Sequence, residues 1–261
     1  MPLAFDLVDA FTAEPFRGNP AAVYLLPSWP ADDWLQRVAR EMNQSETAFL
    51  VRSSGGFELR WFTPLVEVDL CGHATLASAH SLWERAAAGG ERIAFSTRSG
   101  VLTARRSSGL IELDFPLLPV EPWESPAELS AAIGVRPIYV GKSRHDCLLE
   151  VASEAEVRGV QPDFTRLAQV ATRGVIVTAR SSDPAFDFVS RFFAPAAGIN
   201  EDPATGSAHC CLADFWQKKL QQASFRAFQA SARGGVISVR VEGTRAILGG
   251  NAVTVARGEL L

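Results

Sequence analysis

Residues 61–83 read WFTPLVEVDLCGHATLASAHSLW, and residues 192–216 read FFAPAAGINEDPATGSAHCCLADFW. Each stretch runs from an aromatic, strand-like segment through a proline and a loop to a glycine, and then into an alanine-rich segment. The prolines of the two stretches lie 131 residues apart and the glycines lie 134 residues apart. The alanine-rich segments predict helices at about 73–87 and about 207–219.

Alanine-rich helices are common, so this similarity does not by itself establish a duplication. Residues 116–126, PLLPVEPWESP, carry four prolines, a density that predicts a stretch without regular structure and a boundary between two parts of the chain. We therefore predict an α+β fold with two pseudo-symmetric lobes, residues 1–116 and 117–261. Short, mostly antiparallel strands would surround one buried helix in each lobe, with the C-terminal tail free to pack back onto the first lobe.

The segments around these stretches carry local signals of their own. Residues 31–42, ADDWLQRVAREM, place apolar side chains at helical spacing, with two acids at the start and Asn43 as a stop. Residues 46–52, ETAFLVR, predict a strand, and residues 164–171, FTRLAQVA, predict another helix. The second half otherwise resembles the first, with short strands up to the C-terminus.

Composition excludes several classes of protein. Of the 261 residues 47% are hydrophobic and 21% are charged, with a formal net charge of −4, which is typical of a globular protein without a nucleic-acid surface. The four cysteines show no spacing for zinc or for a disulfide framework, which favours a reducing cytoplasm. We expect no signal peptide and no membrane span.

The two glycine-led helix starts are the first candidates for binding. A helix N-terminus exposes unpaired N–H groups and a partial positive charge, so Gly72 and Gly206 would each let a small anion approach the backbone. The alternative is that both are ordinary capped helices. The side chains at these starts favour binding, because one start carries Cys71 and His73 and the other carries Glu201, Asp202, Thr205 and Ser207.

Residues 43–50, NQSETAFL, place one carboxylate, Glu46, directly before an apolar strand. It is either an ordinary exposed strand residue or a base held at the rim of a pocket. A partly desolvated carboxylate of this kind can exchange protons near neutral pH.

Four blocks of sequence together resemble the phenazine-biosynthesis-protein-F-like (PhzF) family, which has the diaminopimelate epimerase fold. The blocks are DAFTAEPFRGNPAAV, NQSETAFL, WFTPLVEVDLCGHATLASA and GINEDPATGSAH, and they occur in the family's order along nearly the whole chain. The resemblance implies that each lobe is a curved sheet or barrel around a central helix, with the active site in the cleft between the lobes. It also implies a cofactor-independent isomerase without a metal, acting on a small carboxylate, and a homodimer.

By motif match, the resemblance assigns roles to individual residues. It implies that Glu46 removes and returns a proton at carbon, with His73, Asp202 and Ser207 as the other catalytic groups. The backbone at Gly72–His73 and at Gly206–Ser207 would hold the substrate carboxylate, and Asn19 would position the substrate. Cys71 and Thr205 are two further candidates.

One departure bears on mechanism. Amino-acid epimerases of this fold use two thiols, but here Cys71 matches only the first, and Pro203 stands where the second would be needed. A two-thiol racemase is therefore disfavoured, and Cys71 is expected to be a small buried residue. A thiol-assisted epimerase using Cys71 with Glu46, and a small-acid-binding protein without turnover, stay open as alternatives. The motif blocks do not identify the substrate.

Overall fold

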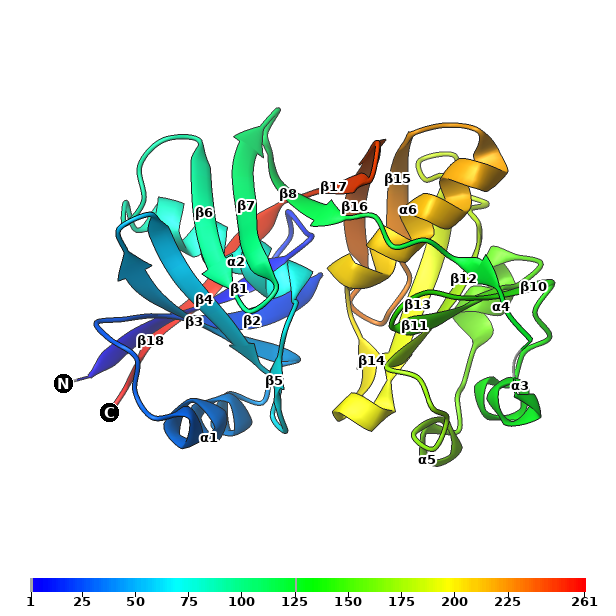
Figure 1. Cartoon of the computed structure of the whole chain (residues 1–261), viewed down its shortest axis with the longest axis horizontal. Coiled ribbons are helices and arrows are strands. Elements are labelled where there is room, and N and C mark those ends of the chain that lie inside the picture. Colours follow the sequence, from blue (N-terminus) through cyan, green and yellow to red (C-terminus); the bar gives the residue numbers. More distant parts are fainter. Residues whose placement is uncertain (1, 125) are drawn as a thin grey trace. The chain divides into compact units, whose positions relative to one another are not determined.

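The computed structural model describes residues 2–124 and 126–261, which form a mixed α/β fold (Figure 1). The chain divides into two compact units. The first unit contains Met1–Phe115 and Leu248–Leu261, and the second contains Pro116–Ile247. The last 14 residues therefore belong to the same unit as the N-terminus.

The first unit is built on a sheet that includes both ends of the chain. Strand β18 pairs antiparallel with β1, so the red and blue strands lie side by side in Figure 1. Its strands are β1 (Leu3–Ala10), β2 (Asn19–Leu26), β3 (Glu46–Ser53), β4 (Gly56–Phe62), β5 (Glu67–Val68), β6 (Arg92–Thr97), β7 (Gly100–Ser107), β8 (Leu110–Pro116) and β18 (Ala252–Leu260). Its helices are α1 (Asp32–Met42) and α2 (Gly72–Glu84).

Helix α1 follows the sequence prediction closely. Leu35, Val38 and Ala39 are buried on its inner face, as the spacing of the apolar residues requires. The helix ends at Asn43, which adopts the left-handed conformation and donates its N–H to the carbonyl of Ala39. The expected helix at 31–42 and its stop are both confirmed.

Helix α2 is the central helix of the first unit. It is buried on all sides from Gly72 to Ala79 and contacts β1, β2, β3, β7 and β18. Seven of its 13 residues are glycine, alanine, serine or threonine, which lets the strands approach closely. The predicted end at residue 87 is wrong: the helix stops at Glu84, because Ala86 adopts a positive φ of 52° that breaks the helical turn.

The second unit repeats this organisation. Its strands are β9 (Glu121–Pro122), β10 (Tyr139–Lys142), β11 (Asp146–Glu150), β12 (Gly174–Arg180), β13 (Phe188–Ala194), β14 (Ile199–Asp202), β15 (Ser224–Gln229) and β16 (Gly235–Glu242). Strand β17 (Arg245–Gly250) begins in this unit and ends in the first. Its helices are α3 (Ala127–Ile133), α4 (Glu154–Gly159), α5 (Phe164–Leu167), a 3₁₀ turn (Pro195–Ala197) and α6 (Gly206–Leu220).

The order of strand pairings is the same in the two units. In the first, β1–β2 is antiparallel, β2–β3 parallel, β3–β4 antiparallel, β4–β6 parallel and β6–β7 antiparallel. In the second, the same alternation runs through β10–β11, β11–β12, β12–β13, β13–β15 and β15–β16. Helix α6 is buried from Gly206 to Trp216, and the Trp216 indole stacks on Phe188 with 5.5 Å between ring centroids.

Several local predictions in the second unit need correction. The stretch 116–126 was expected to lack regular structure, yet Glu121 and Pro122 form the short strand β9, which pairs with β10. Residue 125, in the same stretch, lies outside the described residues. The predicted helix at 164–171 is only the single turn α5, because the chain bends after Leu167 to enter β12.

None of the helices in residues 2–124 and 126–261 is both long enough and apolar enough to cross a lipid bilayer.

Candidate active site

In the first unit, three elements begin at one place. Asn19 is the first residue of β2, Glu46 is the first residue of β3, and His73 is the second residue of α2. Because β2 and β3 are parallel, with Ala21 opposite Glu46, their first residues lie at the same edge of the sheet. This arrangement gathers Asn19, Glu46, Cys71 and His73, and we call them the Glu46 cluster.

The distances within the Glu46 cluster are short. Nε2 of His73 lies 3.5 Å from Oε2 of Glu46. On the other side of the ring, Nδ1 of His73 lies 3.0 Å from Nδ2 of Asn19 and 3.5 Å from Sγ of Cys71. The His73 side chain is 2% exposed and that of Glu46 is 13% exposed, so both groups are largely shielded from water.

Asn19 determines where the His73 ring carries its proton. An amide nitrogen only donates, so with Nδ2 of Asn19 facing the ring, Nδ1 of His73 accepts. The proton of the neutral imidazole then lies on Nε2, which faces Glu46. His73 is thereby held in the tautomer whose N–H faces the Glu46 carboxylate.

The start of α2 lies in the middle of this cluster. Cys71 is the N-cap residue in an extended conformation, and its carbonyl accepts a 2.5 Å hydrogen bond from Oγ1 of Thr75. Gly72 and His73 follow as the first two helical residues, and both are buried. The N–H groups of a helix's first turn have no partner within the helix, so this end can bind an anion beside Glu46.

Glu46, Cys71 and His73 also offer three metal-ligand atoms within 4.8 Å of one another. Such oxygen, sulfur and nitrogen donors are those that zinc takes in proteins. The two nitrogens of His73, however, face different partners, Nε2 toward Glu46 and Nδ1 toward Cys71. One ion binds a single ring nitrogen, so this ring orientation suits proton transfer better than a shared ion.

In the second unit, the predicted residues lie where β14 meets α6. Asp202 ends β14 and Thr205 is the N-cap residue of α6. Oγ1 of Thr205 donates to Oδ2 of Asp202 at 2.5 Å. Gln229, fully buried on β15, accepts from the N–H of Thr205 at 2.7 Å and donates to the carbonyl of Asp202 at 2.6 Å. Gln229 therefore fixes both ends of the loop 202–205.

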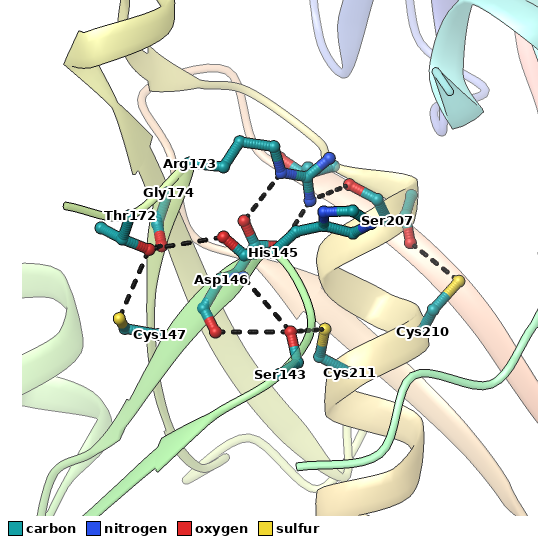
Figure 2. Close-up of polar contacts among 12 residues, drawn as sticks. Ser143, His145, Asp146, Cys147, Thr172, Arg173, Gly174, Ser207, Cys210 and Cys211 are labelled. Atoms are coloured by element: carbon teal, nitrogen blue, oxygen red, sulfur yellow. Dashed lines mark hydrogen bonds and ion pairs between the residues drawn. The ribbon is translucent and has the colours of Figure 1, made fainter. Parts of the chain in front are cut away.

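Ser207 is held by a different pair of residues. Nη2 of Arg173 donates to Oγ of Ser207 at 3.0 Å, and the same guanidinium binds both carboxylate oxygens of Asp146 (Figure 2). Asp146 is fully buried, while the Arg173 side chain is 34% exposed. Gly206 and Ser207 are the first two residues of α6, and both are buried.

The thiols of α6 lie deeper in the second unit. Burial raises the pKa of Cys211 to about 12 and that of Cys210 further still, so both are protonated thiols at neutral pH. Cys211 donates to Oγ of Ser143 at 3.2 Å (Figure 2). A buried, protonated thiol is a poor base, which disfavours both cysteines as proton acceptors.

The structure thus groups the predicted residues by unit. Asn19, Glu46, Cys71, Gly72 and His73 lie together in the first unit, and Asp202, Thr205, Gly206 and Ser207 lie together in the second. Sequence reasoning missed Arg173, Asp146 and Gln229, which support the second group. They lie outside the motif blocks, and their partners are 24 to 34 residues away, so no local pattern points to them.

Comparisons with known proteins agree with the family resemblance. The family model described as phenazine biosynthesis-like protein, PhzC-PhzF, matches residues 8–258. The uncharacterized isomerase BH0283 of Halalkalibacterium halodurans is 53% identical over 257 residues, covering 98% of this chain and 97% of that protein. The uncharacterized isomerase PA3578 of Pseudomonas aeruginosa is 50% identical over 260 residues, covering 100% and 99%.

Solved structures show the same relationship. A PhzF-family protein from Enterococcus faecalis superposes with a TM-score of 0.94 at 41% identity, covering all of both chains. A hydroxyproline epimerase from Agrobacterium vitis shares the fold at a TM-score of 0.67 and 11% identity, covering 99% and 92% of the chains. The chain therefore belongs to the phenazine biosynthesis-like family, PhzC-PhzF, and like its close relatives it is an isomerase.

Proposed function

We propose that the protein isomerises a small carboxylate-bearing metabolite by moving a proton at carbon without a cofactor, with Glu46 as base and then as acid. The observation that carries this proposal is the 3.5 Å approach of Nε2 of His73 to Oε2 of Glu46, beside the N-terminus of α2. An ionisable carboxylate, an imidazole whose N–H faces it and an anion-binding helix end are the parts that proton abstraction next to a carboxylate requires.

The chemical steps follow from the positions of these groups. The N–H groups of Gly72 and His73 bind the substrate carboxylate, which brings a neighbouring C–H bond to Glu46. The ionised Glu46 takes that proton, and the electron pair of the C–H bond moves into the conjugated system of the substrate. Glu46, now protonated, delivers the same proton to another carbon of that system. His73 holds Glu46 in place through both steps.

A second part of the proposal concerns Asp202 and Ser207. We propose that both act on the same substrate, Asp202 in proton transfer and Ser207 in binding an anionic group together with the N–H of Gly206. This part rests on the sequence motifs. It predicts that Asp202→Asn and Ser207→Ala each lower kcat/KM by about a hundredfold or more while the protein stays folded.

The decisive experiment is a proton-exchange screen by NMR in deuterium oxide. Amino acids and cyclic hydroxy and amino acids are incubated with the enzyme, and solvent deuterium at carbon identifies both the substrate class and the labile position. Glu46→Gln keeps the size and hydrogen-bonding reach of the side chain but cannot accept the proton, so exchange should disappear. Glu41→Gln, on the exposed end of α1, is the matched control. Full exchange in Glu46→Gln would remove Glu46 from this role.

A thiol-assisted epimerase is the second candidate, and one observation favours it. Sγ of Cys71 lies 3.5 Å from Nδ1 of His73, the distance at which an imidazole can take a thiol proton. Cys71→Ala separates the two mechanisms. Exchange survives this change if Glu46 works alone, and it is lost if the thiol is the acid or base. Cys147→Ala, a buried free cysteine of the second unit, is the control.

Metal removal tests whether the Glu46 cluster binds a metal ion instead. Under the proposed mechanism, dialysis against EDTA leaves the exchange rate unchanged. A loss of exchange that added zinc restores would instead assign Glu46, Cys71 and His73 to a metal centre. A protein that binds small acids in a thermal-shift assay, but exchanges no proton with any of them, would be a binding protein without turnover.

The proposal extends to the origin of the two units and to the curvature of their sheets. We infer from the shared order of strand pairings that the two units arose by duplication and that each is a curved sheet around its buried helix, α2 or α6. A homodimer and a cytoplasmic location stay predictions from the sequence, and size-exclusion chromatography with light scattering tests the first.

A further inference from the structure

Arg173 is the only cation that the hydrogen bonds of the described residues place on Ser207. It precedes β12, and its N–H donates to the carbonyl of His145 at 3.1 Å, so its backbone is anchored to the segment leading into β11. Its side chain reaches from there to the start of α6 (Figure 2). No sequence motif marked this residue, and the proposed proton transfer gives it no role.

Asp146 fixes the direction of the Arg173 side chain. Nε of Arg173 donates to Oδ1 of Asp146 at 2.8 Å, and Nη2 donates to Oδ2, so the contact is bidentate. Asp146 is itself fixed, because Ser143 donates its N–H to the carbonyl of Asp146 at 2.8 Å. A two-point contact with a buried carboxylate leaves the guanidinium one orientation, in which Nη2 also meets Ser207.

The bond from Arg173 determines what the Ser207 hydroxyl can do. Its oxygen accepts from the guanidinium, so its hydrogen must point to another acceptor. Serine and threonine within a helix commonly donate to the carbonyl four residues back, as Ser78 does to Ala74 at 2.7 Å. Ser207 is the second residue of α6 and has no helical turn behind it. Its hydrogen is therefore available to an acceptor outside the helix.

Charge balance indicates which group meets the substrate. Asp146 neutralises Arg173, so the guanidinium is a poor direct receptor for an anion and a good orienting group. The hydroxyl of Ser207 and the N–H groups that open α6 remain as donors. Together they suit a carboxylate, which accepts several hydrogen bonds at once.

We propose that Arg173, fixed by Asp146, is a positioning residue that holds Ser207 as a hydrogen-bond donor to the anionic group of the substrate. The proposal rests on the proposed function in that Ser207 binds substrate. It predicts that Arg173 acts only through Ser207 and that lysine cannot replace it, because an ammonium group cannot bind Asp146 in two places and Ser207 at the same time.

A double-mutant cycle tests this dependence, with the compound that shows exchange in the wild-type screen as substrate. Arg173→Lys should raise KM about tenfold, the loss expected for one charge-assisted hydrogen bond, and Ser207→Ala should raise it at least as much. The double variant should be no worse than Ser207→Ala alone. The proposal would be overturned if the KM increases of the two single variants multiplied in the double variant, or if KM were unchanged in Arg173→Lys. Arg180→Lys, on the exposed end of β12, is the control.

Binding measurements keep this test independent of catalysis. Acetate and cyclohexanecarboxylate are titrated into wild-type protein, Glu46→Gln and Arg173→Lys, with ligand-observed NMR as the readout. If only Arg173→Lys binds these acids more weakly, the positioning role is supported. This result would hold even if Glu46→Gln kept full deuterium exchange and the proton-transfer proposal therefore failed. Equal binding by all three proteins, or no binding of either acid to the wild type, would overturn it. If Arg173→Lys does not fold, Arg173→Gln is carried through the same titrations.

Discussion

Two histidines at helix starts have opposite surroundings. His73 lies between Asn19 and Glu46, with polar partners at both ring nitrogens. His209, on the first turn of α6, is fully buried, stacks on Phe188 and places Nδ1 2.8 Å from the carbonyl of Thr205. The first faces a carboxylate and an amide, while the second is a structural donor that stays neutral at pH 7.

Asn19 should control the proton on His73. Asn19→Asp replaces the donating amide with a carboxylate that accepts from Nδ1, which reverses the tautomer and favours the imidazolium. We expect kcat to fall at least about tenfold and the His73 limb of the pH profile of kcat/KM to move to higher pH. Asn19→Ala is the control: it should lower kcat without shifting the pH profile of kcat/KM. Identical pH profiles for the two variants would contradict the assignment.

His209 should make stability depend on pH. Burial lowers the pKa of His209 to about 4, although the bond to Thr205 opposes the shift, whereas the unfolded chain has a value near 6.5. The unfolded state therefore binds a proton first. The contribution of His209 to the free energy of unfolding should be at its maximum above about pH 6.5. The free energy of unfolding should then fall by about 3 kcal/mol as the pH drops to about 4.

Urea titrations between pH 4 and 8 measure this dependence. His209→Gln keeps a donor for the carbonyl of Thr205 and removes this titrating group, so its stability should fall by about 3 kcal/mol less than that of the wild type from pH 6.5 to 4. Burial also lowers the pKa of His80, which leaves the variant a smaller dependence in the same direction. A slope as steep in His209→Gln as in the wild type would show that another group is responsible.

At the residue scale, the sequence predicted only those site residues that lie within the motif blocks. Asn19, Glu46 and His73 were named from three separate blocks, and parallel pairing of β2 with β3 explains why they meet. Arg173 and Gln229 were not predictable, because each acts through partners that only the folded sheet brings near.

At the scale of elements, long helices with clear ends were predictable. The helix at 31–42 has apolar spacing, acids in its first turn and Asn43 as a stop, and α6 begins at the expected glycine. Helices α3 and α4 were missed because six or seven residues contain too few turns for a periodic pattern. Strand β14 was missed because its pairing with β13 is irregular and its sequence resembles a loop.

The junction of β14 and α6 should depend on Gln229. Gln229→Leu leaves the N–H of Thr205 and the carbonyl of Asp202 buried without their present partner, which should lower the free energy of unfolding by about 3 kcal/mol. Asp202 would also lose its fixed position, so kcat should fall with it. Gln222→Leu, at an exposed position, should cost no more than about 0.5 kcal/mol. Equal losses in the two variants, measured by urea unfolding, would contradict this role.

At the scale of the whole molecule, each unit contains a buried carboxylate that ties distant segments together. In the first unit, Asp6 on β1 accepts hydrogen bonds from Ser81 and Arg85 at the C-terminal end of α2, and from Arg257 on β18. In the second, Glu154 accepts hydrogen bonds from Ser181 and from both the N–H and the hydroxyl of Ser182, between β12 and β13. The C-terminal strand is thus held by charge as well as by its pairing with β1.

Both carboxylates should make the protein sensitive to acid. Burial alone would raise the pKa of each, but hydrogen bonds and arginine charges outweigh it, so the pKa of Asp6 falls below its usual 3.8 and that of Glu154 falls from 4.5 to about 2. Groups with lowered pKa values stabilise the fold only while they are ionised. Their contribution should be complete above about pH 4.5 and be lost as the pH falls toward about 2.

Asp6→Asn isolates the contribution of the first unit. The amide cannot pair with Arg85 and Arg257, so at pH 7 the free energy of unfolding should drop by about 3 kcal/mol, the low end of the range for a buried ion pair because both arginines reach water. The variant should also lose less stability than the wild type between pH 4.5 and 2, since it has one fewer carboxylate to protonate. Urea unfolding at pH 7 and at pH 3, followed by tryptophan fluorescence, measures both differences. Wild-type stability at pH 7 in Asp6→Asn would mean that strand pairing alone holds β18 in place.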